Sequence, residues 1–226
     1  MKFNLRPDGR TLRHHFSYHW WQYVLVMVLS FFIWNLIFIQ TAYRAPGERR
    51  IDIYVQTVAT GEKEMQSALD DLRAKIAPEV EEINVITILP PSSQDIYANV
   101  QLVTFISAHE GDIYVLGTED FKRFAVQGAF LSLDEAVASG QLIIHPEVDL
   151  RPGYLTVLES LPDGTQKAAT QSMLFGIPLA DYPETAKRLG LIRQDMFLSV
   201  TCYSDNPEST LRFISALLEE GMNTKP

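Results

Sequence analysis

One apolar segment near the N-terminus constrains this 226-residue chain more than any other feature. From residue 20 to residue 42 nearly every side chain is apolar or aromatic and none is charged, with the densest run over 24–39. A helix needs about 20 such residues to cross the hydrocarbon core of a bilayer. Aromatic rings mark the two ends of the segment, where a membrane meets water: Trp20, Trp21 and Tyr23, then Tyr43. A helix in a soluble core would show a polar face, so the segment predicts a transmembrane helix over 20–43, surrounded by membrane lipid.

The charges that flank this segment predict its orientation. Four Lys or Arg residues and one Asp precede it, whereas three Arg residues and one Glu follow it closely. Positive charge is retained on the cytoplasmic side of a membrane, so we expect a cytoplasmic tail over 1–19 and an extracellular C-terminal domain. A cleaved signal peptide would have an apolar core of about 7–15 residues and a small-x-small cleavage site. The longer run and the absence of a clean site predict an uncleaved signal-anchor that crosses the cell membrane once.

The charge balance changes sharply after the apolar segment. Residues 1–50 carry a formal charge of +5, and residues 51–226 carry −14, which together give the −9 of the chain. Nucleic-acid binding depends on Lys and Arg that neutralise phosphates, so we expect no nucleic-acid partner. Such an acidic domain should also avoid an anionic membrane surface.

About 175 residues follow the segment, enough for one domain with its own core. We therefore expect a short tether over 44–50, which contains Pro46-Gly47, and a single domain over 51–226. Cys202 is the only cysteine, which excludes an intramolecular disulfide. It lies in an apolar stretch over 196–203, and this setting predicts a buried, unreactive thiol.

The first half of the domain alternates strand and helix patterns. Period-two or β-branched runs predict strands over 50–56, 83–89 and 112–116, and apolar spacing of three to four residues predicts helices over 62–77 and 95–108. Parallel neighbours need such crossovers. The order therefore predicts an α/β fold, a three-layer domain with a mostly parallel or mixed sheet.

The second half is less regular. Helices are expected over 118–124 and 181–190, from a capping box at Ser132–Glu135 to Gly140, and from Asn206-Pro207-Glu208 onwards. Strands are expected over 142–144, 154–159, 167–177 and 197–203. Two apolar stripes should face the core: Met65, Leu69, Leu72 and Ile76, then Phe213, Ile214, Leu217 and Leu218.

Four segments share the order of motifs of a known family. They are Gly111–Leu116, Gly128–Leu133, Phe175-Gly176-Ile177-Pro178, and Asp205–Glu208 followed by Phe213-Ile214. Together they resemble the extracellular solute-binding proteins of bacterial ABC importers, in which the third motif usually reads YGIP. The resemblance implies a periplasmic-binding-protein-like lobe. Family members have two lobes that close on a ligand, whereas this chain has room for about one, and its domain lacks the Trp residues that sugar binders stack on sugars.

Catalytic chemistry has little support in the sequence. The acidic pairs consist of adjacent residues, whose side chains point apart on a helix or strand: Asp70-Asp71, Glu81-Glu82, Glu119-Asp120 and Asp134-Glu135. No nucleophile motif, phosphate-binding loop or zinc-like Cys/His spacing accompanies them. We therefore expect no enzyme activity, no catalytic residue, no metal site and no cofactor.

A small ligand, if one binds, should lie beyond the carboxyl ends of the parallel strands. That rule predicts ligand contacts at Thr57, Gly117, Thr118 and Glu119, with Phe175 nearby.

Two functions from different classes follow from these features. The first is a non-catalytic, membrane-anchored extracellular domain, a reduced solute-binding protein that serves as an accessory or interaction subunit beside an integral membrane transporter. The alternative is an extracellular receptor for a small solute or peptide, in which a homodimer supplies the missing half of the cleft. The acidic domain would then favour cationic ligands.

Overall fold

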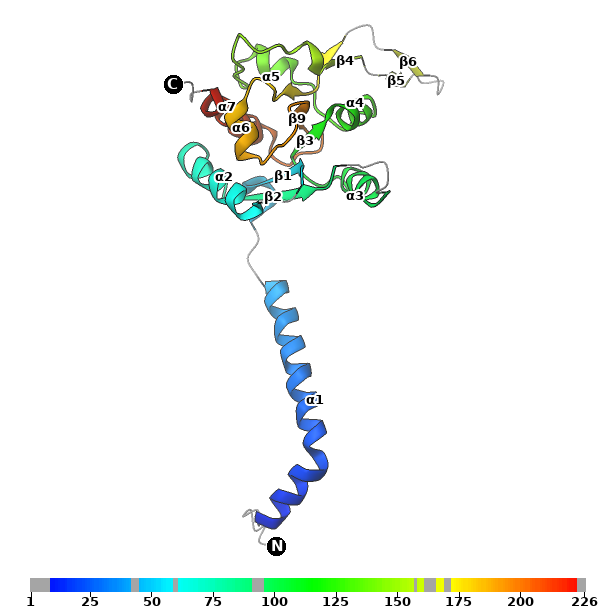
Figure 1. Cartoon of the computed structure of the whole chain (residues 1–226), viewed down its shortest axis with the longest axis vertical. Coiled ribbons are helices and arrows are strands. Elements are labelled where there is room, and N and C mark those ends of the chain that lie inside the picture. Colours follow the sequence, from blue (N-terminus) through cyan, green and yellow to red (C-terminus); the bar gives the residue numbers. More distant parts are fainter. Residues whose placement is uncertain are drawn as a thin grey trace. The chain divides into compact units, whose positions relative to one another are not determined.

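The structure is a computed structural model that describes residues 9–41, 45–58, 61–90, 96–156, 158–160, 166–168 and 172–222. The chain forms two units, residues 1–44 and residues 45–226 (Figure 1).

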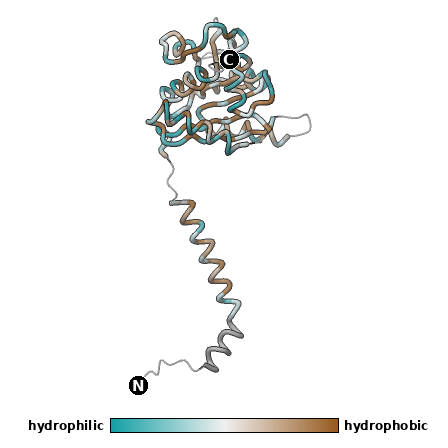
Figure 2. Tube along the Cα trace, turned by 60° about the vertical axis from the view of Figure 1, so that its left-hand side comes forward, coloured by the Kyte–Doolittle hydropathy of each residue, from teal (hydrophilic) through white to brown (hydrophobic). Residues whose placement is uncertain are grey.

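The first unit contains one long helix, α1, over Gly9–Thr41. Its stretch Trp20–Ile39 has a mean hydropathy of 2.1, is long and apolar enough to cross a membrane, and is not buried against the rest of the protein. Figure 2 shows the apolar colouring along this part of the helix. The expectation that the segment is not a core helix of the domain is confirmed. The helix begins at Gly9, well before the apolar run that the sequence marks.

The second unit is built on a mixed five-stranded sheet with the order β2-β1-β3-β9-β8. The strands are β1 (Arg50–Gln56), β2 (Glu82–Ile88), β3 (Ile113–Gly117), β8 (Ile177–Pro178) and β9 (Met196–Val200). Strands β1, β2 and β3 are parallel, whereas β9 runs antiparallel to both β3 and β8. The first three strands match their predictions to within one residue at each end.

Helices cover both faces of this sheet (Figure 1). On one face α2 (Glu62–Ile76), α6 (Pro183–Arg188) and α7 (Pro207–Met222) pack around the larger apolar core, which also holds residues of α5 (Asp134–Ala138). On the other face α3 (Ile96–Ser107) and α4 (Thr118–Val126) enclose a second core rich in Phe and Tyr. The three-layer α/β architecture is therefore confirmed.

Local sequence explains where α7 begins. The side-chain oxygen of Asn206 accepts a hydrogen bond from the Ser209 amide at 3.2 Å, which satisfies one of the free N–H groups of the first turn. The four residues predicted to face inward are 0–1% exposed: Phe213, Ile214, Leu217 and Leu218. On α2 the predicted stripe is also turned inward, with Met65, Leu69 and Leu72 buried and Ile76 partly buried.

The predicted capping box before α5 is wrong. The residue before the helix is Leu133, and no side chain caps the helix. The Ser132 hydroxyl instead donates to the Asp134 carboxylate at 2.9 Å, and the other expected partner, Glu135, is exposed. The helix begins at Asp134, so Ser132 lies one residue too early to act as its N-cap.

The strand predicted over 142–144 is also wrong. The Leu142 amide donates to the Ala136 carbonyl at 2.9 Å, and the Ile143 amide donates to the Ser215 hydroxyl at 3.0 Å. These backbone groups therefore bond to α5 and α7 and not to a neighbouring strand. The apolar character of the segment reflects burial of Leu142, which is 1% exposed.

Two long predicted strands are divided into shorter pieces. The run over 154–159 contributes β4 (Tyr154–Leu155) and the start of β5 (Leu158–Ser160). The run over 167–177 contributes to β6 (Gln166–Ala168), β7 (Met173–Leu174) and β8, while residues 169–171 lie outside the described residues. β4 pairs with β7 and β5 pairs with β6, each in a separate two-stranded sheet. Short 3₁₀ turns precede β1 and β4, at Gly47–Arg49 and Arg151–Gly153.

Two further expectations change in the structure. Cys202 follows β9 and is exposed, with its thiol 3.3 Å from the Gly128 carbonyl, so the prediction of a buried thiol is wrong. The strand ends at Val200, two residues earlier, which places the cysteine in a turn. Part of the expected tether is folded onto the domain, since Ala45 is 4% exposed and its amide donates to Glu82 at 3.3 Å.

Candidate functional site

The carboxyl ends of β1 and β3 meet, as the sequence predicts. The two strands pair in parallel with Val55 opposite Val115, so Thr57 and Gly117 follow at the same edge. Thr118 and Glu119 begin α4 directly after β3. The structure therefore brings four of the five predicted ligand residues to one edge of the sheet, although binding there stays a prediction.

The side chain of Gln56 fills the space between these strand ends. Its carbonyl oxygen accepts from the Gly117 amide at 2.8 Å, and its amide group donates to Asp120 at 2.7 Å. Both Gln56 and Asp120 are buried, and the second Asp120 oxygen pairs with Arg123 at 2.8 Å. Buried polar groups are usually hydrogen-bonded, and here both oxygens of Asp120 and both polar atoms of the Gln56 side chain have a partner within the protein. Sequence reasoning missed Gln56, although a polar residue at the last position of a buried strand is a usable signal.

A segment from residue 190 to 195 covers the same edge. The Thr57 hydroxyl donates to the Gly190 carbonyl at 2.7 Å. The Thr118 amide and hydroxyl both lie 3.2 Å from the Asp195 carbonyl, to which they donate. The polar groups of Thr57 and Thr118 are therefore used within the protein, and of the predicted set Glu119 is the one that is exposed.

Phe175 lies elsewhere. It precedes β8, which runs in the same direction as β3 because both are antiparallel to β9. Phe175 is thus at the amino end of its strand, whereas Gly117 is at the carboxyl end of β3. Its ring is 4% exposed and belongs to the second core together with Phe121 and Phe197. The structure does not place this residue beside the other four.

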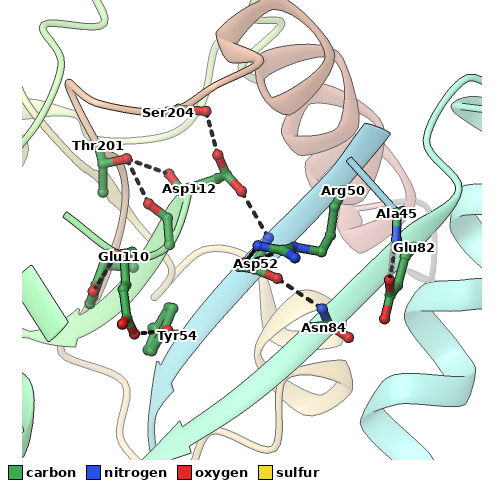
Figure 3. A network of polar contacts seen from close by, with 12 residues as sticks. Ala45, Arg50, Asp52, Tyr54, Glu82, Asn84, Glu110, Asp112, Thr201 and Ser204 are labelled. Atoms are coloured by element: carbon green, nitrogen blue, oxygen red, sulfur yellow. Dashed lines mark hydrogen bonds and ion pairs between the residues drawn. The ribbon is translucent and has the colours of Figure 1, made fainter. Parts of the chain in front are cut away.

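A second polar cluster joins β1 and β2 to the residue before β3 and to the loop after β9, near the opposite ends of β1 and β3 (Figure 3). Asp112, just before β3, accepts from the Asp52 amide at 2.9 Å and from the Ser204 hydroxyl at 2.6 Å. Asp52 accepts from Asn84 at 2.9 Å and pairs with Arg50 at 2.8 Å. Each carboxylate oxygen of the two aspartates therefore has a donor. The cluster of Arg50, Asp52, Asn84, Asp112 and Ser204 holds these segments together and is referred to below as the clamp.

Aromatic hydroxyls continue this clamp. The Tyr54 hydroxyl donates to the Glu110 carboxylate at 3.2 Å, and the Tyr114 hydroxyl donates to the Glu110 carbonyl at 2.8 Å. Burial raises the pKa of all three tyrosines in this region, that of Tyr203 to about 12. Burial likewise raises the pKa of the Asp112 carboxyl. The tyrosines therefore stay neutral near pH 7 and serve as hydrogen-bond donors within the fold.

Comparison with known proteins gives matches in structure only. No protein-family model matches the chain, and no curated protein matches it in sequence. One similar solved structure is an extracellular solute-binding protein of family 1 from Alicyclobacillus acidocaldarius, with 20% identity and a TM-score of 0.40, covering 64% of this chain and 33% of that one. Another is an ABC substrate-binding protein from Listeria monocytogenes in complex with cycloalternan. It has 14% identity and a TM-score of 0.39, and the match covers 64% of this chain and 34% of that one. A third, an ABC transporter substrate-binding protein from Bradyrhizobium japonicum, has 11% identity and a TM-score of 0.39, covering 74% and 77%.

These matches fall in the class of proteins that the sequence motifs resemble. This chain spans about a third of the length of the first two. Because the identities are 20% or lower and the TM-scores are 0.40 or lower, we infer function from the residues of this chain.

Proposed function

We propose that this protein is a non-catalytic, membrane-anchored extracellular domain that serves as an accessory or interaction subunit beside an integral membrane transporter. The observation that carries this proposal is the filled carboxyl edge of the sheet. Ligands of open α/β sheets bind at that edge, and here Gln56 and Asp120 occupy it with hydrogen bonds to each other and to the backbone. A domain with this edge filled is better suited to contacts through its outer surface.

The apolar helix supports the same proposal. Twenty residues of α1 are apolar enough to cross a membrane. Holding a domain at a membrane raises its effective concentration near a membrane partner, so that weak surface contacts suffice. The sequence motifs of solute-binding proteins favour a transporter as that partner.

The acidic pairs support a non-catalytic role. In the pair Glu119-Asp120 the first side chain is exposed, while the second is buried and bound by Gln56 and Arg123. In the pair Asp134-Glu135 the first carboxylate accepts from Ser132 and from the Leu174 amide, and the second is exposed. Neither pair presents two carboxylates to one substrate, as catalysis by a carboxylate pair requires.

Copurification from native membranes tests the proposal. The full-length chain, extracted in mild detergent, should enrich one integral membrane transport protein over a control chain that ends at Arg44 and carries α1 without the domain. A second control keeps the domain and replaces Trp20–Ile39 by an unrelated apolar span. Retention of the partner by this control would assign the contact to the domain. If neither the natural chain nor the control with the replaced apolar span enriches a membrane transport protein above the α1 control, the proposal is wrong.

A further inference from the structure

A groove on the larger core side of the domain lies apart from the filled edge. It has a volume of about 610 Å³ and is formed by three segments that are distant in sequence: residues 143–148, residues 181–184 and the C-terminal turn of α7. The volume falls within the range of about 300–1,000 Å³ that is usual for small-molecule sites.

The surface of the groove is part apolar and part polar. Val148, Tyr182 and Leu218 are among the lining residues but are only 8%, 1% and 1% exposed, so they offer little surface to a ligand. The accessible apolar surface comes from Ile143, which is 61% exposed, and from Ile144 and Met222, which are partly buried. A hydrocarbon chain placed against these residues would remove apolar surface from water, which stabilises the complex.

The rim of the groove is acidic. Four carboxylates line it, and no Lys or Arg is among the lining residues: Glu147, Asp181, Glu184 and Glu219. In the part of the chain that the structure describes, no ion pair is formed by any of the four. The neighbouring Glu220, by contrast, pairs with Arg188 at 2.6 Å. A cleft lined by charge of one sign with apolar walls concentrates its field and attracts counter-ions.

Hydrogen bonds hold the walls of the groove in place. The Thr185 hydroxyl donates to the Leu217 carbonyl at 2.9 Å, which joins α6 to α7. The Ser215 hydroxyl accepts from the Ile143 amide at 3.0 Å and thereby joins the first segment to α7. The His145 amide donates to the Tyr182 hydroxyl at 3.4 Å and joins the first segment to the second. A site that is already formed loses less entropy when a ligand binds.

We propose that this groove binds an organic cation that carries ammonium groups on a short hydrocarbon chain. The carboxylates of the rim attract the ammonium groups, and the accessible apolar side chains, Ile143 above all, contact the hydrocarbon. The inference goes beyond the accessory role and is independent of it, because binding requires no membrane partner.

A six-carbon series of probes tests the proposal with the full-length chain in nanodiscs of zwitterionic lipid. We expect 1,6-diaminohexane to bind in titration calorimetry, 1,6-hexanediol to bind at least about tenfold more weakly, and adipate not to bind. Affinity for the diamine should fall as NaCl is raised from about 50 to 300 mM, because salt screens exposed charges. Equal affinity for the diamine and the diol, or no binding of the diamine, would overturn the proposal.

Matched variants locate the site. Glu147→Gln with Glu184→Gln should weaken diamine binding at least about tenfold. Glu64→Gln with Glu135→Gln changes the net charge equally at exposed positions outside the groove, and should leave the affinity within about twofold. Ile143→Ser tests the apolar contact and should weaken binding severalfold with no change in charge. Equal losses in the two Glu double variants would show general attraction to an acidic domain and would overturn the site. The copurification experiment is read separately, so failure of either proposal leaves the other standing.

Discussion

At the scale of single residues, Asp112 shows how burial and charge compete inside the clamp. Two donors, the Ser204 hydroxyl and the Asp52 amide, stabilise its carboxylate. Burial opposes this effect and is the largest influence, and the nearby Asp52 and Asp205 carboxylates act in the same direction, so the pKa of Asp112 is raised. The folded state therefore holds the proton more tightly than the unfolded state. The stabilisation that results is complete below the unfolded pKa and is lost as the pH rises through the folded pKa.

Substituting Asp112 by Asn should remove this pH dependence. The amide oxygen of Asn can still accept from the Asp52 amide, and its group carries no charge at any pH. We expect the Asp112→Asn variant to gain stability relative to the natural chain as the pH rises from about 4. Urea unfolding at several pH values between about 4 and 8 measures the difference. A difference that does not vary with pH would contradict the assignment, and Asp112→Ala, which loses both acceptors, should cost about 1–3 kcal/mol.

At the scale of elements, the sequence was sufficient for β1, β2, β3, α2 and α7, because each has a local period and clear end signals. It was not sufficient for the contacts between them. Gln56 bonds to Asp120, 64 positions away, and Asp112 bonds to Ser204, 92 positions away. Such pairs depend on the register of strands that meet only after folding, so the sequence predicts the edge of the sheet and not its filling.

The hydrogen bonds of Gln56 lead to a prediction about the turn from β3 into α4. Gln56→Met keeps the approximate length of the side chain and leaves the Gly117 amide without its acceptor and one Asp120 oxygen without its Gln56 donor. We expect a loss of about 2 kcal/mol or more in the free energy of unfolding. Gln56→Glu keeps an acceptor for Gly117 but places a carboxylate against Asp120, so its cost should be larger at pH 7 than at pH 5.

Chemical denaturation of both Gln56 variants at the two pH values provides the measurement. The natural chain at each pH is the control for general acid effects. If the loss of stability of Gln56→Glu relative to the natural chain were the same at pH 5 and pH 7, residue 56 would not lie close to the Asp120 carboxylate.

The contact between α6 and α7 makes a second prediction at this scale. A Cβ added to Gly221 would overlap the Thr185 hydroxyl, which itself donates to the Leu217 carbonyl. Gly221→Ala should therefore cost about 1–3 kcal/mol, the usual range for overpacking. In the double variant with Thr185→Ala the overlap with the hydroxyl is relieved. Its loss of stability should therefore be smaller than the sum of the losses of the two single variants.

A double-mutant cycle with four unfolding curves measures this coupling. We expect a coupling energy of about 1 kcal/mol with the sign of mutual rescue. Additive losses would show that the two helices are further apart at Gly221 than the structure has them. The same helices form two walls of the acidic groove, so Gly221→Ala should also weaken diamine binding.

At the scale of the whole molecule, the most informative sequence feature is the apolar segment near the N-terminus. The apolar segment is continuous in sequence and needs no partner to be recognised, and it lies within a single exposed helix. The groove shows the opposite case, because its walls come from residues 143–148, residues 181–184 and the C-terminal turn of α7. Acidic residues in separate segments give no sign in the sequence that they will share one cavity. The sequence predicted Cys202 as buried for a similar reason, since an apolar stretch does not show where the strand within it ends.

The exposure of Cys202 provides a test of membrane topology with the natural chain. It is the only cysteine of the protein and lies on the surface of the domain. If the N-terminal tail is cytoplasmic and the domain extracellular, a membrane-impermeant maleimide should label the chain in intact cells from which any outer barrier has been removed. Cys202→Ser is the matched control and should remain unlabelled. Labelling only after the membrane is permeabilised would place the domain inside the cell and would contradict the extracellular role. The orientation predicted from the flanking charges would then be wrong.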